Sequence, residues 1–117
     1  MKTIDIANIW EDDETIELTI RLSNGETSCK MTFYAVDDTF VKFANGLIDF
    51  PKNTSHIVQY ESGTWENAGH YLFLKVFCVA PNGASAMKVV AKNFFSAPST
   101  SEALFYIQPL YLLSHSL

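Results

Sequence analysis

The chain of 117 residues has 48% hydrophobic residues, including nine Phe, five Tyr and two Trp, and a net charge of −5 at pH 7. The apolar content is enough for a core and the length fits one domain over residues 1–117, so a wholly disordered chain is excluded. The acidic balance and the single Arg, Arg21, argue against a nucleic-acid-binding protein, because such proteins bind phosphates with clustered Lys and Arg.

The sequence also predicts where the protein is found. Its N-terminus, MKTIDIANIW, lacks the uninterrupted apolar run of a secretory signal, and no apolar stretch reaches the length of about 18 residues that spans a bilayer. We therefore expect a cytoplasmic protein that does not enter the membrane. Cys29 and Cys78 are too few for a disulfide framework, so two buried free thiols are expected, with a redox pair as the alternative.

The first half of the chain predicts strands and one helix. Residues 4–10 alternate weakly, which is compatible with a short strand or with a segment lying across a sheet. Residues 15–22 alternate cleanly, and Ser23-Asn24-Gly25 predicts a tight turn into a return strand over 26–34 with Cys29, Met31 and Phe33 facing inward. A helix is predicted over 38–49, with Asp38 as its N-cap, and its apolar stripe should bury against the first hairpin; the stripe is Phe40, Ala44 and Leu47, and the expected contacts are Ile16, Leu18 or Phe33.

The second half predicts further strands. Residues 56–61 alternate, and residues 70–79 are apolar on both faces, which is typical of a central strand. That strand should form a hairpin with residues 84–95, closed around Asn82-Gly83. A last strand over 102–108 places Ala103, Phe105 and Ile107 on one face, and Pro109 predicts the start of a short C-terminal helix.

These elements predict the α+β fold class. We expect one antiparallel β-sheet of about six strands, with one helix after the second strand and the short C-terminal helix packed on one face.

No catalytic residues, metal site or cofactor is predicted. The chain has no G-x-S-x-G elbow, P-loop or dinucleotide fingerprint. His56, His70 and His115 are scattered and are expected at the surface or at strand ends. The run from Glu11 to Glu14 lacks the alternate-residue spacing of a calcium loop. The sequence therefore favours a protein that is not an enzyme.

Two aromatic and acidic pairings are candidate partner-binding residues. Trp10 is followed by Glu11, Asp12 and Asp13, and Trp65 is followed by Glu66. Carboxylates steer encounter with a basic partner, and an exposed Trp is a good interface anchor. The alternative is that each Trp covers an edge of the core and that the acidic run is a solvated turn.

The order of several short motifs resembles a family of small bacterial proteins, the WapI-type immunity proteins of polymorphic toxin systems. The motifs run along nearly the whole chain: Ile4-Asp5-Ile6, Trp10 with its acidic run, Ile16-Glu17-Leu18, Ser23-Asn24-Gly25, Phe33-Tyr34, Phe43-Ala44, Phe50-Pro51 and Gly63-Thr64-Trp65. The resemblance implies no catalytic residues. It implies a binding protein that neutralises a cognate protein toxin by direct contact.

Two other functions stay open from the residues alone. One is a small-ligand-binding domain with a pocket between helix and sheet, lined by the surplus Phe and Tyr side chains. The other is an accessory structural domain without a specific ligand. The sequence does not determine the oligomeric state.

Overall fold

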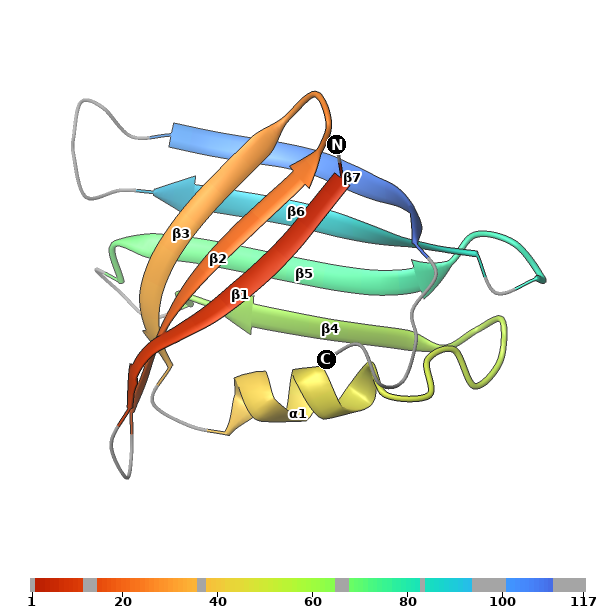
Figure 1. The fold of residues 1–117 in the computed structure, drawn as a ribbon, viewed down its shortest axis with the longest axis horizontal. Coiled ribbons are helices and arrows are strands. Elements are labelled where there is room, and N and C mark those ends of the chain that lie inside the picture. Colours follow the sequence, from red (N-terminus) through yellow and green to blue (C-terminus); the bar gives the residue numbers. More distant parts are fainter. Residues whose placement is uncertain are drawn as a thin grey trace.

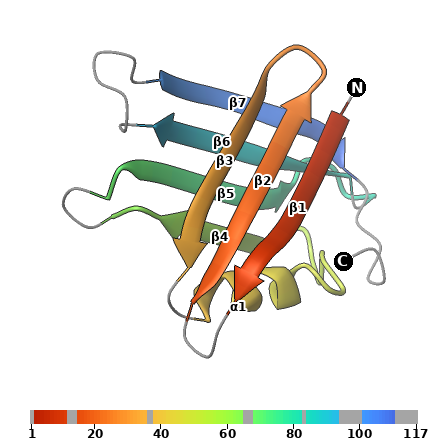
Figure 2. The ribbon, with the colours of Figure 1, turned by 60° about the vertical axis from the view of Figure 1, so that its left-hand side comes forward.

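The computed structural model describes residues 2–11, 15–35, 38–64, 68–82, 84–93 and 101–110. In these ranges the chain forms seven antiparallel strands in two sheets and one short helix. The three-stranded sheet has the order β1-β2-β3 and comprises β1 (Lys2–Glu11), β2 (Ile16–Asn24) and β3 (Ser28–Ala35). The four-stranded sheet has the order β4-β5-β6-β7 and comprises β4 (Ile57–Ser62), β5 (His70–Cys78), β6 (Ser85–Asn93) and β7 (Ser101–Leu110). The strands of the first sheet cross in front of those of the second (Figures 1 and 2).

The antiparallel arrangement is confirmed, but the prediction of one sheet of about six strands is wrong. The segment 4–10 is part of a full strand, β1, which pairs with β2 from Lys2 opposite Asn24 to Glu11 opposite Ile16. Consequently α1 (Thr39–Gly46) follows the third strand rather than the second. The chain changes sheets at α1, since β3 precedes it in one sheet and β4 follows it in the other.

The first predicted hairpin is confirmed. The Asn24 side-chain Oδ1 accepts hydrogen bonds from the backbone N–H groups of Glu26, at 2.9 Å, and Thr27, at 2.8 Å. Gly25 has φ 97°, a conformation that glycine adopts without steric cost. This turn sets the register in which Leu18, Ile20 and Leu22 of β2 all face inward.

The predicted central hairpin is also confirmed. β5 lies between β4 and β6, and its side chains at Leu72, Leu74 and Val76 are almost completely buried. The connection to β6 is longer than a two-residue turn, because Val79 N–H donates to the Ala84 carbonyl at 2.9 Å and the Ala84 N–H donates to Asn82 Oδ1 at 3.0 Å. Gly83 lies outside the described residues.

The core fills the space between the two sheets. It combines inward side chains from both sheets, among them Leu18, Ile20, Leu22 and Phe33 from the first and Leu72, Leu74, Val76, Val89, Phe105 and Ile107 from the second. β3 and β5 contribute alternate residues, as half-buried antiparallel strands do. The other face of each sheet is therefore left on the outside of the molecule.

The helix is shorter than the predicted range of 38–49 and is placed differently. It lies along β4 (Figure 1), and its buried side chains are Phe40 and Phe43, followed by Leu47 just after its end. Ala44 is only half-buried. Tyr60 of β4 contacts the rings of Phe40 and Phe43 at centroid distances of 5.2 and 5.8 Å. Asp38 occupies the N-cap position without a side-chain capping bond.

The predicted C-terminal helix does not begin at Pro109. Pro109 and Leu110 belong to β7, which is an edge strand. A proline is tolerated in an edge strand, because a backbone position that faces away from the sheet donates no ladder hydrogen bond. The rest of that predicted helix, residues 111–117, lies outside the described residues. Within the described ranges, no helix is long and apolar enough to cross a membrane.

Candidate partner-binding face

Of the six partner-binding residues predicted from the sequence, the structure describes only the backbone of Trp10 and Glu11. The backbone of Trp10 and Glu11 lies at the end of β1, opposite Glu17 and Ile16. Asp12, Asp13, Trp65 and Glu66 lie outside the described residues. The acidic-loop hypothesis therefore stays a prediction.

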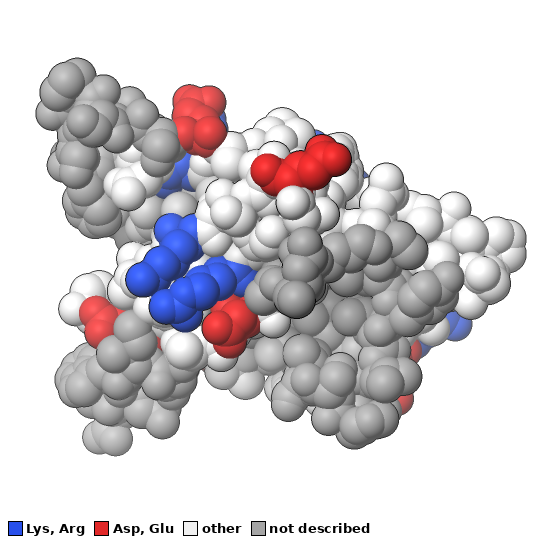
Figure 3. Space-filling model, turned by 45° about the horizontal axis from the view of Figure 1, so that its top comes forward, with Lys and Arg blue, Asp and Glu red and all other residues white. Residues whose placement is uncertain are grey.

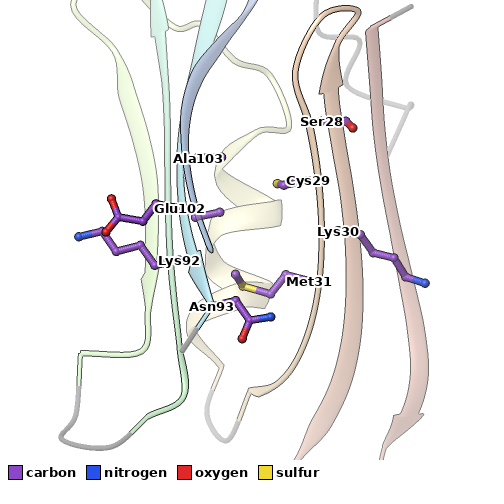
Figure 4. A pocket seen from close by; sticks show the side chains of 9 residues that line it. Ser28, Cys29, Lys30, Met31, Lys92, Asn93, Glu102 and Ala103 are labelled. Atoms are coloured by element: carbon purple, nitrogen blue, oxygen red, sulfur yellow. The ribbon is translucent and has the colours of Figure 1, made fainter. Parts of the chain in front are cut away.

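A second candidate binding surface lies on the four-stranded sheet, on the side that faces away from the three-stranded sheet. We call this surface the outer face. It is formed by Ile57, Gln59 and Glu61 of β4, Tyr71, Phe73, Lys75 and Phe77 of β5, Lys88, Val90 and Lys92 of β6, and Glu102, Leu104 and Tyr106 of β7. In Figure 4 the side chains of Lys92 and Glu102 point away from the three-stranded sheet, whereas Cys29 and Met31 point toward the space between the sheets.

Large apolar side chains are exposed on the outer face. Leu104 is 62% exposed, Ile57 51% and Tyr106 42%. The strand register places Phe73, Val90 and Leu104 side by side across β5, β6 and β7. Phe73, Val90 and Leu104 therefore form a continuous apolar row across three strands.

Two aromatic rings meet across β6 beside that row. Phe77 lies opposite Ala86 on β6, and the small Ala86 side chain is completely buried. The rings of Phe77 and Tyr106 meet edge to face, with centroids 6.5 Å apart. This geometry is a favourable one for aromatic pairs and holds Tyr106 in place on the edge strand.

Lysines and glutamates lie among the apolar residues. Lys75 is directly opposite Lys88, and the Lys75 Nζ lies 5.7 Å from the centre of the Phe77 ring. Lys92 is opposite Glu102, and its Nζ lies 5.8 Å from the centre of the Tyr71 ring.

Glu61 is already engaged on the same face. The Tyr71 hydroxyl donates to Glu61 Oε2 at 2.5 Å, and this hydrogen bond, together with partial desolvation and the nearby negative charge, raises the pKa of Tyr71 to about 12. The phenol is therefore a neutral donor at physiological pH.

A Ser–His pair is present, but it is sealed in the interior. The Ser62 Oγ lies 2.9 Å from His70 Nε2, and both residues are buried. The His70 ring stacks on Phe33 with centroids 5.1 Å apart, so His70 is a core residue, and it lies at the first position of β5, which agrees with the expectation of histidines at the surface or at strand ends. Burial lowers the pKa of His70, and its hydrogen bond to the Ala68 backbone opposes this effect only in part. A substrate carbonyl has no access to a hydroxyl in this position.

A small cavity opens between β3 and the ends of β6 and β7 (Figure 4), with a volume of about 220 Å³. The side chains lining its inner part are Cys29, Met31, Ala91 and Ala103. It differs from the predicted ligand pocket in place and in lining, because the described residues that line it include no residue of the helix and no Phe or Tyr. Its volume is below the range of about 300–1,000 Å³ typical of small-molecule sites.

Both cysteines carry free thiols. Burial raises the pKa of Cys29. The Cys78 Sγ is 3.7 Å from the Asn53 carbonyl oxygen. In the part of the chain that the structure describes, no three His, Cys, Asp or Glu residues are grouped so that they could hold a metal ion.

The chain matches no known family model, no curated protein and no solved structure. The outer face is therefore interpreted from its own residues. A signal for it was present in the sequence, since Leu104 and Tyr106 alternate with Phe105 and Ile107 and make the last strand apolar on both sides.

Proposed function

We propose that the protein is a non-enzymatic binding protein that neutralises a cognate protein toxin by direct contact. The observation that carries the proposal is the exposure of Leu104 and Tyr106 on β7 and of Ile57 on β4, on one sheet face and with half-buried apolar side chains of β5 and β6 between them. Contiguous exposed apolar surface rimmed by polar residues marks interaction sites, whereas scattered exposed apolar residues are ordinary.

The interior supports a binding role rather than catalysis. The Ser62 and His70 side chains satisfy each other inside the core, where they stabilise the junction of β4 and β5. The outer face, in contrast, exposes aromatic side chains and amphipathic lysines, and aromatic residues are enriched at interfaces between proteins.

The class of partner comes from the resemblance to WapI-type immunity proteins. A protein of that class binds one toxin domain and blocks it. The acidic run that begins at Glu11 is a second surface in this proposal, suited to steering toward a basic toxin cleft.

The proposal is tested with the gene beside this one. If that gene encodes a large secreted protein with a toxin-like C-terminal domain, this domain is produced in bacterial cells, once alone and once together with the protein described here. The proposal requires that co-production restores growth and that the two chains co-elute as a stable complex. A toxin domain that still kills the cell in the presence of an equal amount of folded protein contradicts it.

A further inference from the structure

The outer face has a charge pattern opposite to that of the whole chain. The net charge of the protein is −5, yet the outer face carries three lysines, Lys75, Lys88 and Lys92, and two glutamates, Glu61 and Glu102. Of the two glutamates, Glu61 accepts the hydrogen bond of Tyr71, and Glu102 is directly opposite Lys92. Three lysines and two glutamates leave a net charge of +1 on this face, and Lys75 and Lys88 are the lysines with no glutamate opposite them.

These two lysines form a like-charge pair in the middle of the sheet. They are opposite each other on the two central strands, β5 and β6. Directly opposed side chains on neighbouring strands have Cβ atoms about 4.5–5.5 Å apart, and like charges at this spacing repel. Among the described residues, the ion pairs are those of Arg21 with Asp5 and of Lys42 with Asp38, so neither Lys75 nor Lys88 has a carboxylate partner.

Most side chains around this pair are apolar, and the polar Gln59 of β4 lies directly opposite Lys75. On one side lie Phe73, Val90 and Leu104, and on the other lie Phe77 and Ile57, with Tyr106 directly next to Lys88. An incoming carboxylate between the two ammonium groups replaces their repulsion by two charge-assisted contacts. The apolar rows on either side exclude water and strengthen those contacts.

We infer that the outer face binds a partner segment in which an acidic side chain is flanked by apolar side chains, with the carboxylate seated between Lys75 and Lys88. The inference rests on the proposed function, because it names the chemistry of the protein that this face would bind. It differs from the acidic-loop hypothesis, which requires a basic partner surface.

Two other occupants fit the face less well. A second copy packed symmetrically on this pair brings the two lysine pairs together, which is repulsive. A nucleic acid requires several phosphate contacts, whereas this face carries three lysines together with two glutamates and has no Arg. Figure 3 shows a similar pattern on another side of the molecule, where basic side chains sit directly beside acidic ones rather than forming an extended basic field.

The test uses short random peptides displayed on phage and selected on the intact protein. The selected sequences are then synthesised, and their affinities are measured for the parent and for the Lys75→Met/Lys88→Met variant. Met keeps the apolar stem of each lysine and removes its charge. The matched control is Lys30→Met/Lys52→Met, which removes the same number of charges from exposed lysines outside the outer face.

The inference predicts peptides enriched in Asp or Glu next to aromatic or aliphatic residues, with affinity reduced at least about tenfold by the Lys75/Lys88 variant and unchanged by the control. Peptides without acidic enrichment, or with affinity unaffected by the Lys75/Lys88 variant, overturn it. Tighter binding of oligothymidylate than of any peptide overturns it in favour of a nucleic acid. If no peptide is selected, the inference fails as well.

A further variant, Leu104→Ser, separates this inference from the proposed function. Peptides that depend on Leu104 but not on the two lysines leave the outer face as a protein-binding surface and refute only the acidic preference. Peptides whose affinity depends neither on Leu104 nor on the two lysines would show that the outer face is not the binding surface, and the proposed function would then lose its structural support.

Discussion

The hydroxyl of Ser62 and the Nε2 atom of His70 are 2.9 Å apart in the interior, one on the last residue of β4 and the other on the first residue of β5. Because burial lowers the pKa of His70 below its ordinary value of 6.5, the folded protein binds fewer protons than the unfolded chain between that lowered pKa and about pH 6.5. The free energy of unfolding is therefore expected to fall as the pH drops through about 6.5.

Urea unfolding at a series of pH values measures this effect. The His70→Gln variant keeps a polar group near Ser62 without a titrating ring, so its stability should change less than that of the parent between about pH 7 and pH 5.5. The His56→Gln variant serves as the control and should retain the loss. An equal pH dependence in parent and His70→Gln refutes the assignment of the effect to His70.

Gly63 is expected to tolerate no side chain. Its φ is 90°, and a Cβ atom built there lies 2.0 Å from the backbone oxygen of His70. Gly63→Ala should therefore cost at least about 2 kcal/mol of the free energy of unfolding, since it combines an unfavourable backbone conformation with a clash against backbone. Gly25→Ala, at φ 97° in the exposed hairpin turn, measures the conformational part alone and should cost less. Equal losses for the two variants speak against the close approach of Gly63 to β5.

Tyr60 is expected to be the residue that fixes the helix onto the sheets. Its ring contacts Phe40 and Phe43 of α1 and lies 6.3 Å from the ring of Phe33 on β3. Tyr60→Ala should destabilise the protein by about 3–5 kcal/mol, the usual cost of deleting a buried aromatic ring. Val41→Ala, on the exposed side of the same helix, should change stability by no more than about 0.5 kcal/mol. Chemical denaturation of both variants checks the pair, and a small loss for Tyr60→Ala contradicts this packing.

The acidic run provides a separate prediction about association. Replacing Glu11, Asp12 and Asp13 together by Ala should slow binding to the cognate toxin domain most strongly at low salt, where charges are least screened. Stopped-flow association rates at two salt concentrations measure the effect. Equal rates for parent and triple variant at low salt show that the run does not contribute to the interface.

Local sequence signals predicted much of this fold because they act through neighbouring residues. The Ser23-Asn24-Gly25 turn and the alternation from Ile16 to Leu22 determine the first hairpin without help from the rest of the chain. The division into two sheets was not predictable in this way. The helix between β3 and β4 separates two strands that pair in different sheets. The alternation of apolar residues in a strand shows which face is buried, but it does not show which strand lies beside it.

The errors at the two ends of the chain have a common physical cause. β1 alternates weakly and is an edge strand whose Ile4 and Ile6 are each 37% exposed, so its pattern carries little of the burial signal. Pro109 is a good first residue of a helix in isolation, but it is also tolerated in an edge strand such as β7. The outer face was visible in the alternation of Leu104 and Tyr106, yet it becomes a surface only through pairing with β5 and β6.

If the outer face of the four-stranded sheet is the protein-binding surface, a charge placed on it should weaken binding. Titration calorimetry measures the affinity of the Leu104→Glu variant for the cognate toxin domain. Leu104 is 62% exposed, so the substitution should leave the fold intact while placing a charge in the apolar row. We expect an affinity at least about tenfold lower than that of the parent. Ile48→Glu, a matched change at an apolar residue that is 41% exposed beyond the helix, should show no such loss. Equal affinities of parent and Leu104→Glu would show that the outer face is not the binding surface.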